Sequence, residues 1–197
     1  HKGKLEILFH QFVTLFKGGQ ELRMSKRAGV YVTMDELLEM VGRDATRFFF
    51  LQKSADTHLN FDVDRAKEQS AKNPVYYVQY AHARISSILR KLKAQSEKRK
   101  TTTQNLKLLN HPSEIALIKQ LISLPEIVED TSRDYQVQRL PQYALDLATA
   151  FHQFYRDCRV ITEDKNLTNA RLALILATKT ILKSTLDLMG ISAPEKM

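Results

Sequence analysis

A short basic turn near the start of the chain carries the residues best suited to phosphate chemistry. It reads Arg23-Met24-Ser25-Lys26-Arg27 and lies between two glycine-containing stretches. Lys26 could bring an ammonium group to a triphosphate, and Ser25 could bring a hydroxyl. Nucleotidyl chemistry needs such cations, because charge on the phosphate oxygens must be neutralised as the bond breaks. Taken alone the five residues are weak evidence, since many exposed loops contain lysine, arginine and serine.

A strip of phenols and cations forms a second candidate site. On a helix, which turns by about 100° per residue, four side chains fall within an arc of about 60°: Tyr77, Tyr80, Arg84 and Lys91. Phenol rings stack on unpaired bases, and cations pair with phosphates. The alternative is that the tyrosines lie half-buried at the margin of a core with their hydroxyls in water. As a group, the four side chains favour contact with RNA.

The elements that must position this strip are long helices. We expect them at about 64–98, 113–130, 137–162 and 167–189, with Pro74 kinking or resetting the first. An apolar stripe runs beside the strip on the first helix: Val78, Ala81, Ile85, Ile88, Leu89 and Leu92. Such a stripe packs into a core. The back of the chain therefore reads as an all-α bundle.

The front of the chain reads as short elements joined by turns. Thr33 and Glu36 have the spacing of a capping box, which opens a short helix that Gly42 can end. Asp44 is expected to cap the following helix, at about 45–53.

The chain is basic, with 30 Lys and Arg against 22 Asp and Glu and a formal net charge of +8. The segment 84–107 holds eight basic residues and one acid, so +7 of that charge lies there. Such a run can be a solvated face, or it can attract a polyanion by displacing condensed counterions. The apolar fraction of 43% allows a real core. No stretch approaches the roughly 20 apolar residues of a membrane span.

Metal chemistry finds little support. The six histidines show no metal-binding spacing with Cys158 or the acids, so we expect no zinc. Asp56, Asp62 and Asp64 lack the central glycine and terminal glutamate of a calcium loop, and capping of helices is the simpler interpretation. Cys158, the single cysteine, follows aromatic residues on a helix and is expected to be a small packed side chain.

The basic turn resembles the Lys-Met-Ser-Lys-Ser signature of class I aminoacyl-tRNA synthetases, with Arg23 for the first Lys and Arg27 for the final Ser. The segments 28–51 and 73–85 look like arginyl-tRNA synthetases of the bacterial type. The stretch 169–197 is similar to that family's anticodon-binding domain, which is named for an Asp-Ala-Leu-Arg motif that is matched here only loosely. The resemblance covers nearly the whole chain.

The resemblance implies a mainly α fold in two parts. Residues 1–63 would be the C-terminal remnant of an α/β Rossmann-type catalytic domain, and residues 64–197 a helical-bundle anticodon-binding domain. The whole enzyme would use ATP to activate arginine and attach it to its tRNA. A stand-alone tRNA-binding helical module without catalysis is the alternative, and a helical interaction protein with accidental similarity is a third.

Site residues follow from the same resemblance. Lys26 would stabilise the α- and β-phosphates as pyrophosphate leaves, and the other residues of the turn would shape the loop around ATP and its Mg counter-ion. The anticodon would be contacted from the helix of Tyr80 and Arg84, from Tyr155 and from Met197. The His-Ile-Gly-His signature of the class is not in this sequence, so we expect that the 197-residue chain alone neither activates arginine nor holds a cofactor tightly. We expect a cytoplasmic monomer.

Overall fold

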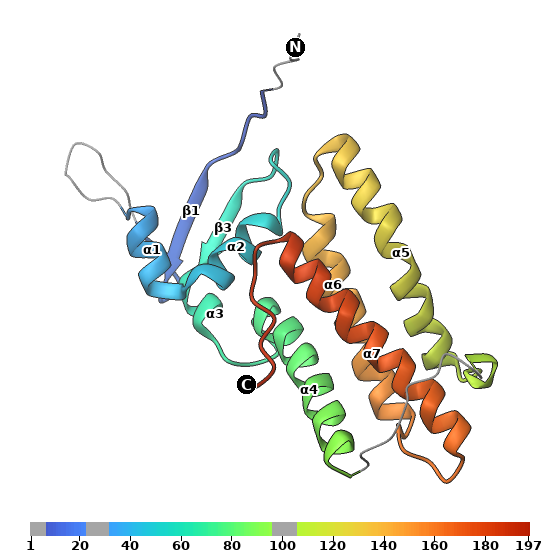
Figure 1. The fold of residues 1–197 in the computed structure, drawn as a ribbon. Coiled ribbons are helices and arrows are strands. Elements are labelled where there is room, and N and C mark those ends of the chain that lie inside the picture. The colour runs from blue at the N-terminus through green and yellow to red at the C-terminus, as the bar shows by residue number, and fades with distance from the viewer. Residues whose placement is uncertain (1–6, 23–31, 96–105) are drawn as a thin grey trace, which may run out of the picture.

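The structure, a computed structural model, describes residues 7–22, 32–95 and 106–197. A small sheet with short helices forms one end, and a bundle of long helices forms the rest (Figure 1). The expected mainly α fold is confirmed. No helix in the described part of the chain is long and apolar enough to cross a membrane.

The sheet has the strand order β2-β1-β3. β1 (Val13–Lys17) turns through Gly18 and Gly19 into β2 (Gln20–Glu21), and both glycines have positive φ, as a tight hairpin turn demands. β3 (Leu59–Asp62) lies parallel to β1. Parallel strands need a long crossover, and here the crossover includes helices α1 and α2. β1, β3 and the crossover helices therefore form a small α/β unit.

The crossover helices begin and end for local reasons. α1 (Met34–Val41) starts at the predicted capping box, in which the Thr33 hydroxyl accepts from the Glu36 N–H at 3.1 Å and the Glu36 carboxylate accepts from the Thr33 N–H at 2.7 Å. Gly42, with φ of 80°, ends α1. The prediction that Asp44 caps the next helix is wrong, because α2 (Arg43–Leu51) already begins at Arg43 and Gly42 is its N-cap.

Pro74 resets the predicted helix 64–98. α3 (Val63–Lys67) is short, is capped by Asp62, and packs on the front elements. α4 (Pro74–Gln95) then begins at the proline, whose missing N–H costs nothing in a first helical turn. Asn73 bridges the break, with its amide donating to the Ala66 carbonyl at 3.0 Å and accepting from the Val75 N–H at 3.2 Å.

Three further helices complete the bundle with α4: α5 (Pro112–Asp134), α6 (Arg139–Asp157) and α7 (Lys165–Leu188). A short 3-10 turn, η1 (Leu106–Leu108), precedes them. Val78, Ala81 and Ile85 of the predicted stripe are fully buried. Ile88 and Leu89 pack at the edge of the core, and the side chain of Leu92 lies outside the described residues. The stripe therefore faces the core, which leaves the neighbouring strip of α4 free to face outward.

Candidate nucleic-acid interface

Arg84 lies at the centre of the candidate site, between aromatic rings from two helices. Its guanidinium donates to the hydroxyl of Tyr80, one helical turn earlier on α4, at 2.9 Å. The guanidinium carbon lies 4.5 Å from the ring centre of Tyr155 on α6 and 5.7 Å from that of Tyr80. Both distances are within the range of cation–π attraction. The contacts hold the planar cation against two aromatic rings at the surface.

A cavity of about 700 Å³ opens at this cluster. Five predicted site residues line it: Tyr80, Arg84, Lys91, Tyr155 and Met197. They come from α4, from α6 and from the end of the chain. Tyr155 and Met197 had been expected here only from the family resemblance, and the fold brings them to the α4 strip.

The last residues of the chain reach the cavity because they are tied along α4 (Figure 1). The His82 ring bonds the Pro194 carbonyl at 2.8 Å, and Arg90 donates to the Glu195 carbonyl at 3.0 Å. Lys179 of α7 forms an ion pair with the Glu195 carboxylate at 2.7 Å. These contacts position the segment that ends in Met197.

The C-terminal tail, residues 189–197, is also bonded to helix α2 near the N-terminal sheet. Asp44 accepts hydrogen bonds from the Gln79 amide at 2.8 Å and from the Ser192 N–H at 3.2 Å, so its carboxylate joins α2, α4 and the tail. Arg47 donates to the Met189 carbonyl at 2.6 Å. Asp44 therefore acts as a junction between distant segments instead of as the predicted helix cap.

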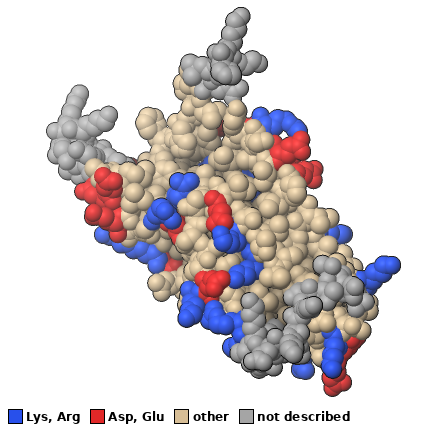
Figure 2. Space-filling view, in the orientation of Figure 1, with Lys and Arg blue, Asp and Glu red and all other residues tan. Residues whose placement is uncertain are grey.

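The cavity is strongly basic. Its charged lining residues are Arg84, Arg90, Lys91 and Lys196 against the single acid Glu195. The hydrogen bond and charge of Lys179 lower the pKa of that acid, so it stays ionised but paired. Figure 2 shows Lys and Arg side chains gathered where the tail ends beside α4. Such a surface attracts a polyanion, and its flat rings can stack on bases.

Sequence reasoning missed part of the site. The tail residues Glu195 and Lys196 line the cavity, and Ile161 reaches it from the loop between α6 and α7. Arg90 was visible only as one member of a basic run. No periodicity pointed to these positions, because their approach depends on how the tail and the loop cross α4.

Tyr77 is not part of this cavity. Its hydroxyl lies 3.4 Å from that of Thr149, and its ring centre lies 5.0 Å from the His152 ring. Tyr77 therefore packs half-buried against α6.

The ATP-loop candidates Arg23, Met24, Ser25, Lys26 and Arg27 lie outside the described residues. The strands that precede them are described, and Asp64 at the start of α3 accepts from the Gly18 N–H in the β1–β2 turn.

The chain is similar in sequence and in fold to known proteins. The family DALR anticodon binding domain matches residues 78–197. The chain is 48% identical over 199 residues to an arginine–tRNA ligase of Heliobacterium modesticaldum, covering 98% of this chain and 35% of that protein. It is 50% identical over 197 residues to one of Symbiobacterium thermophilum, covering 100% of this chain and 35% of the relative. The structure of Thermus thermophilus arginyl-tRNA synthetase superposes with a TM-score of 0.71 at 29% identity, covering 93% of this chain and 34% of that one. The chain thus spans about a third of the length of these relatives.

Proposed function

Because this chain belongs to the DALR anticodon binding domain family, we propose that it binds the anticodon loop of a tRNA for arginine as part of an arginine–tRNA ligase. The cavity around Arg84 carries the proposal. A base that leaves the stack of the loop can lie against Tyr80 or Tyr155, and the loop's phosphates can pair with Lys91 and its basic neighbours. Met197 adds an apolar contact at the same place.

Binding of tRNA to the 197-residue chain tests this function. Arg84→Ala removes the cation held between the two rings, so the dissociation constant should rise by about 5- to 150-fold, which corresponds to about 1–3 kcal/mol. Arg133→Ala is the matched control, because the ion pairs of Arg133 within the described residues are with exposed acids of its own helix α5, and Arg133 does not line the cavity. Equal affinities for the two variants would count against the cavity.

Dependence on salt separates RNA binding from a protein–protein role. Each phosphate contact releases condensed counterions, so affinity for tRNA should fall steeply as salt rises. Arg84→Ala should also show a shallower slope if its guanidinium meets a phosphate. A tRNA affinity that does not change with salt concentration would favour the alternative that the chain is a helical protein-interaction domain.

We propose further that the longer protein joins arginine to this tRNA with ATP and its Mg counter-ion. Lys26 would then neutralise charge as pyrophosphate leaves. In the full-length ligase, Lys26→Ala should slow adenylate formation far more than it weakens arginine binding. A collapse of arginine affinity would refute that role. The 197-residue chain alone should show no ATP–pyrophosphate exchange with tRNA present.

We propose a cytoplasmic location, because tRNA charging takes place there. We also propose that the protein is a monomer, which gel filtration tests.

A further inference from the structure

Ile161 brings an apolar side chain to the cavity around Arg84 from the loop between α6 and α7. Ile161 is 51% exposed, although Cys158 and Val160 just before it are buried in the core. A β-branched side chain has few rotamers, so its direction is set mainly by the backbone that carries it. The exposed isoleucine thus belongs to a loop that is anchored in the core on its N-terminal side.

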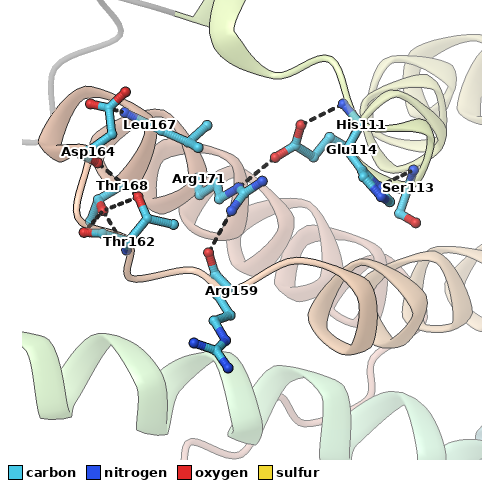
Figure 3. A network of polar contacts seen from close by, with 9 residues as sticks. All are labelled: His111, Ser113, Glu114, Arg159, Thr162, Asp164, Leu167, Thr168 and Arg171. Carbon is cyan, nitrogen blue, oxygen red and sulfur yellow. Dashed lines mark hydrogen bonds and ion pairs between the residues drawn. The ribbon is translucent and has the colours of Figure 1, made fainter.

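Hydrogen bonds from α7 hold the loop backbone on both sides of Ile161 (Figure 3). Before it, Arg171 donates to the Arg159 carbonyl at 2.7 Å. After it, the Thr162 N–H donates to the Thr168 hydroxyl at 2.9 Å, and that hydroxyl donates to the Thr162 carbonyl at 3.2 Å. Arg171 and Thr168 are three positions apart, so they lie on one face of α7. The backbone around Ile161 is therefore fixed to a single helix face.

The two α7 side chains that hold the loop are themselves held firmly. Arg171 forms its ion pair with the fully buried Glu114 at 2.6 Å. Thr168 is only 2% exposed. Side chains packed in this way have little freedom to move. The position of Ile161 in the cavity is therefore set by the interior of the bundle.

The chemistry of Ile161 suits selection of a base better than attraction of a phosphate. Its side chain carries no charge and forms no hydrogen bonds, whereas Arg84 and Lys91 of the same cavity are cations. A base that turns a polar edge toward a fixed apolar side chain loses hydrogen bonds to water and gains none in return.

We infer that Ile161 is a specificity-determining residue for the base that the cavity accepts. Arg171 and Thr168 are positioning residues, which act on Ile161 through the loop backbone. The inference rests on the proposed function.

Relative affinities for a series of RNAs test the inference. The probes are the anticodon stem-loop of a tRNA for arginine and stem-loops that each differ from it at one anticodon base. The readout is the dissociation constant of each altered stem-loop divided by that of the arginine stem-loop. Ile161→Asn supplies a hydrogen-bonding side chain, so this ratio should fall by about 5- to 150-fold for at least one altered base. Ile161→Val keeps an apolar β-branched side chain and should keep every ratio.

Thr168→Val tests the positioning role, because it removes the hydroxyl that holds Thr162 and keeps the shape of the side chain. The same ratio should fall in this variant. It should also fall in Arg171→Met, measured at a temperature at which circular dichroism shows the variant to be folded. Thr178→Val is the matched control, since the buried Thr178 hydroxyl donates to the Leu174 carbonyl of its own helix, about 15 Å further along α7.

The ratios separate positioning from stability. A loss of folded chain would weaken the binding of every stem-loop by the same factor and leave the ratios unchanged. Unchanged ratios in Ile161→Asn, with binding still weakened by Arg84→Ala, would overturn this inference and leave the proposed function intact. A ratio that falls in Ile161→Asn, but no more in Thr168→Val than in Thr178→Val, would overturn the positioning role. An arginine stem-loop that does not bind the unmodified chain would overturn the proposed function and the inference with it.

Discussion

The bundle should be sensitive to the loss of either partner of the buried ion pair between Glu114 and Arg171 (Figure 3). Glu114 is fully buried, and the side chain of Arg171 is only 12% exposed. One carboxylate oxygen accepts from Arg171 at 2.6 Å, and the other accepts from the His111 N–H at 2.9 Å. Arg171 also donates to the Arg159 carbonyl at 2.7 Å. The pair thus ties α7 to the start of α5 and to the loop after α6.

Arg171→Met leaves the Glu114 carboxylate buried with a single backbone donor. Breaking a buried pair from one side costs about 3–5 kcal/mol, because an uncompensated charge remains. A loss of this size is a large part of the roughly 5–15 kcal/mol that stabilises a typical protein. It corresponds to a fall of about 6–20 °C in the melting temperature of a chain this long.

Urea unfolding at pH 7, followed by circular dichroism, measures the effect. Arg133→Met is the matched control, since the Arg133 side chain is 67% exposed and its pairs should contribute less than about 1 kcal/mol. The double variant Glu114→Leu with Arg171→Met should lose less stability than Arg171→Met alone, because no charge is left unpaired. The reasoning is refuted if Arg171→Met costs no more than the control, or if the double variant is the less stable.

Two other outcomes are expected. The pKa values of His82 and His152 are lowered, chiefly by burial, so below about pH 6.5 the unfolded chain binds more protons than the folded one. The free energy of unfolding should therefore fall as the pH drops from 7 to 5. In the His152→Phe variant this free energy should fall less over the same range. Equal slopes of free energy against pH in the two proteins would contradict the role given to His152. Gly190 has φ of 67°, and an added Cβ would lie 2.8 Å from the Arg47 guanidinium. Gly190→Ala should lower the free energy of unfolding, measured in urea, by about 1–3 kcal/mol. It should also weaken tRNA binding, because the tail would be less firmly held. An unchanged tRNA affinity would show that the tail does not position the residues of the cavity.

Local chemistry made much of the fold predictable. The capping box of Thr33 and Glu36 spans three residues and needs no partner elsewhere, so its position was right. The inward stripe of α4 and the outward Tyr80 and Arg84 follow from helical spacing alone. Pro74 marked a break because proline cannot donate to a preceding turn.

Long-range pairings were beyond such reasoning. Asp44 has the residue type and spacing of a helix cap, but its carboxylate accepts a hydrogen bond from the N–H of Ser192, 148 positions away. Tyr77 and Tyr80 share one arc of the helix and both contact His152 of α6, yet of the two only Tyr80 lines the basic cavity around Arg84. Which of the two tyrosines lines the cavity depends on how α6 crosses α4, and no sequence pattern predicts that crossing.

Crosslinking tests the anticodon proposal most directly. The stem-loop of a tRNA for arginine, with 4-thiouridine placed through its anticodon, can be irradiated with the 197-residue chain and the attached peptides identified by mass spectrometry. We predict attachment at Tyr80, at Tyr155 and at the C-terminal peptide that ends in Met197. Attachment confined to the faces of α5 and the sheet, with none of these peptides modified, would contradict the account.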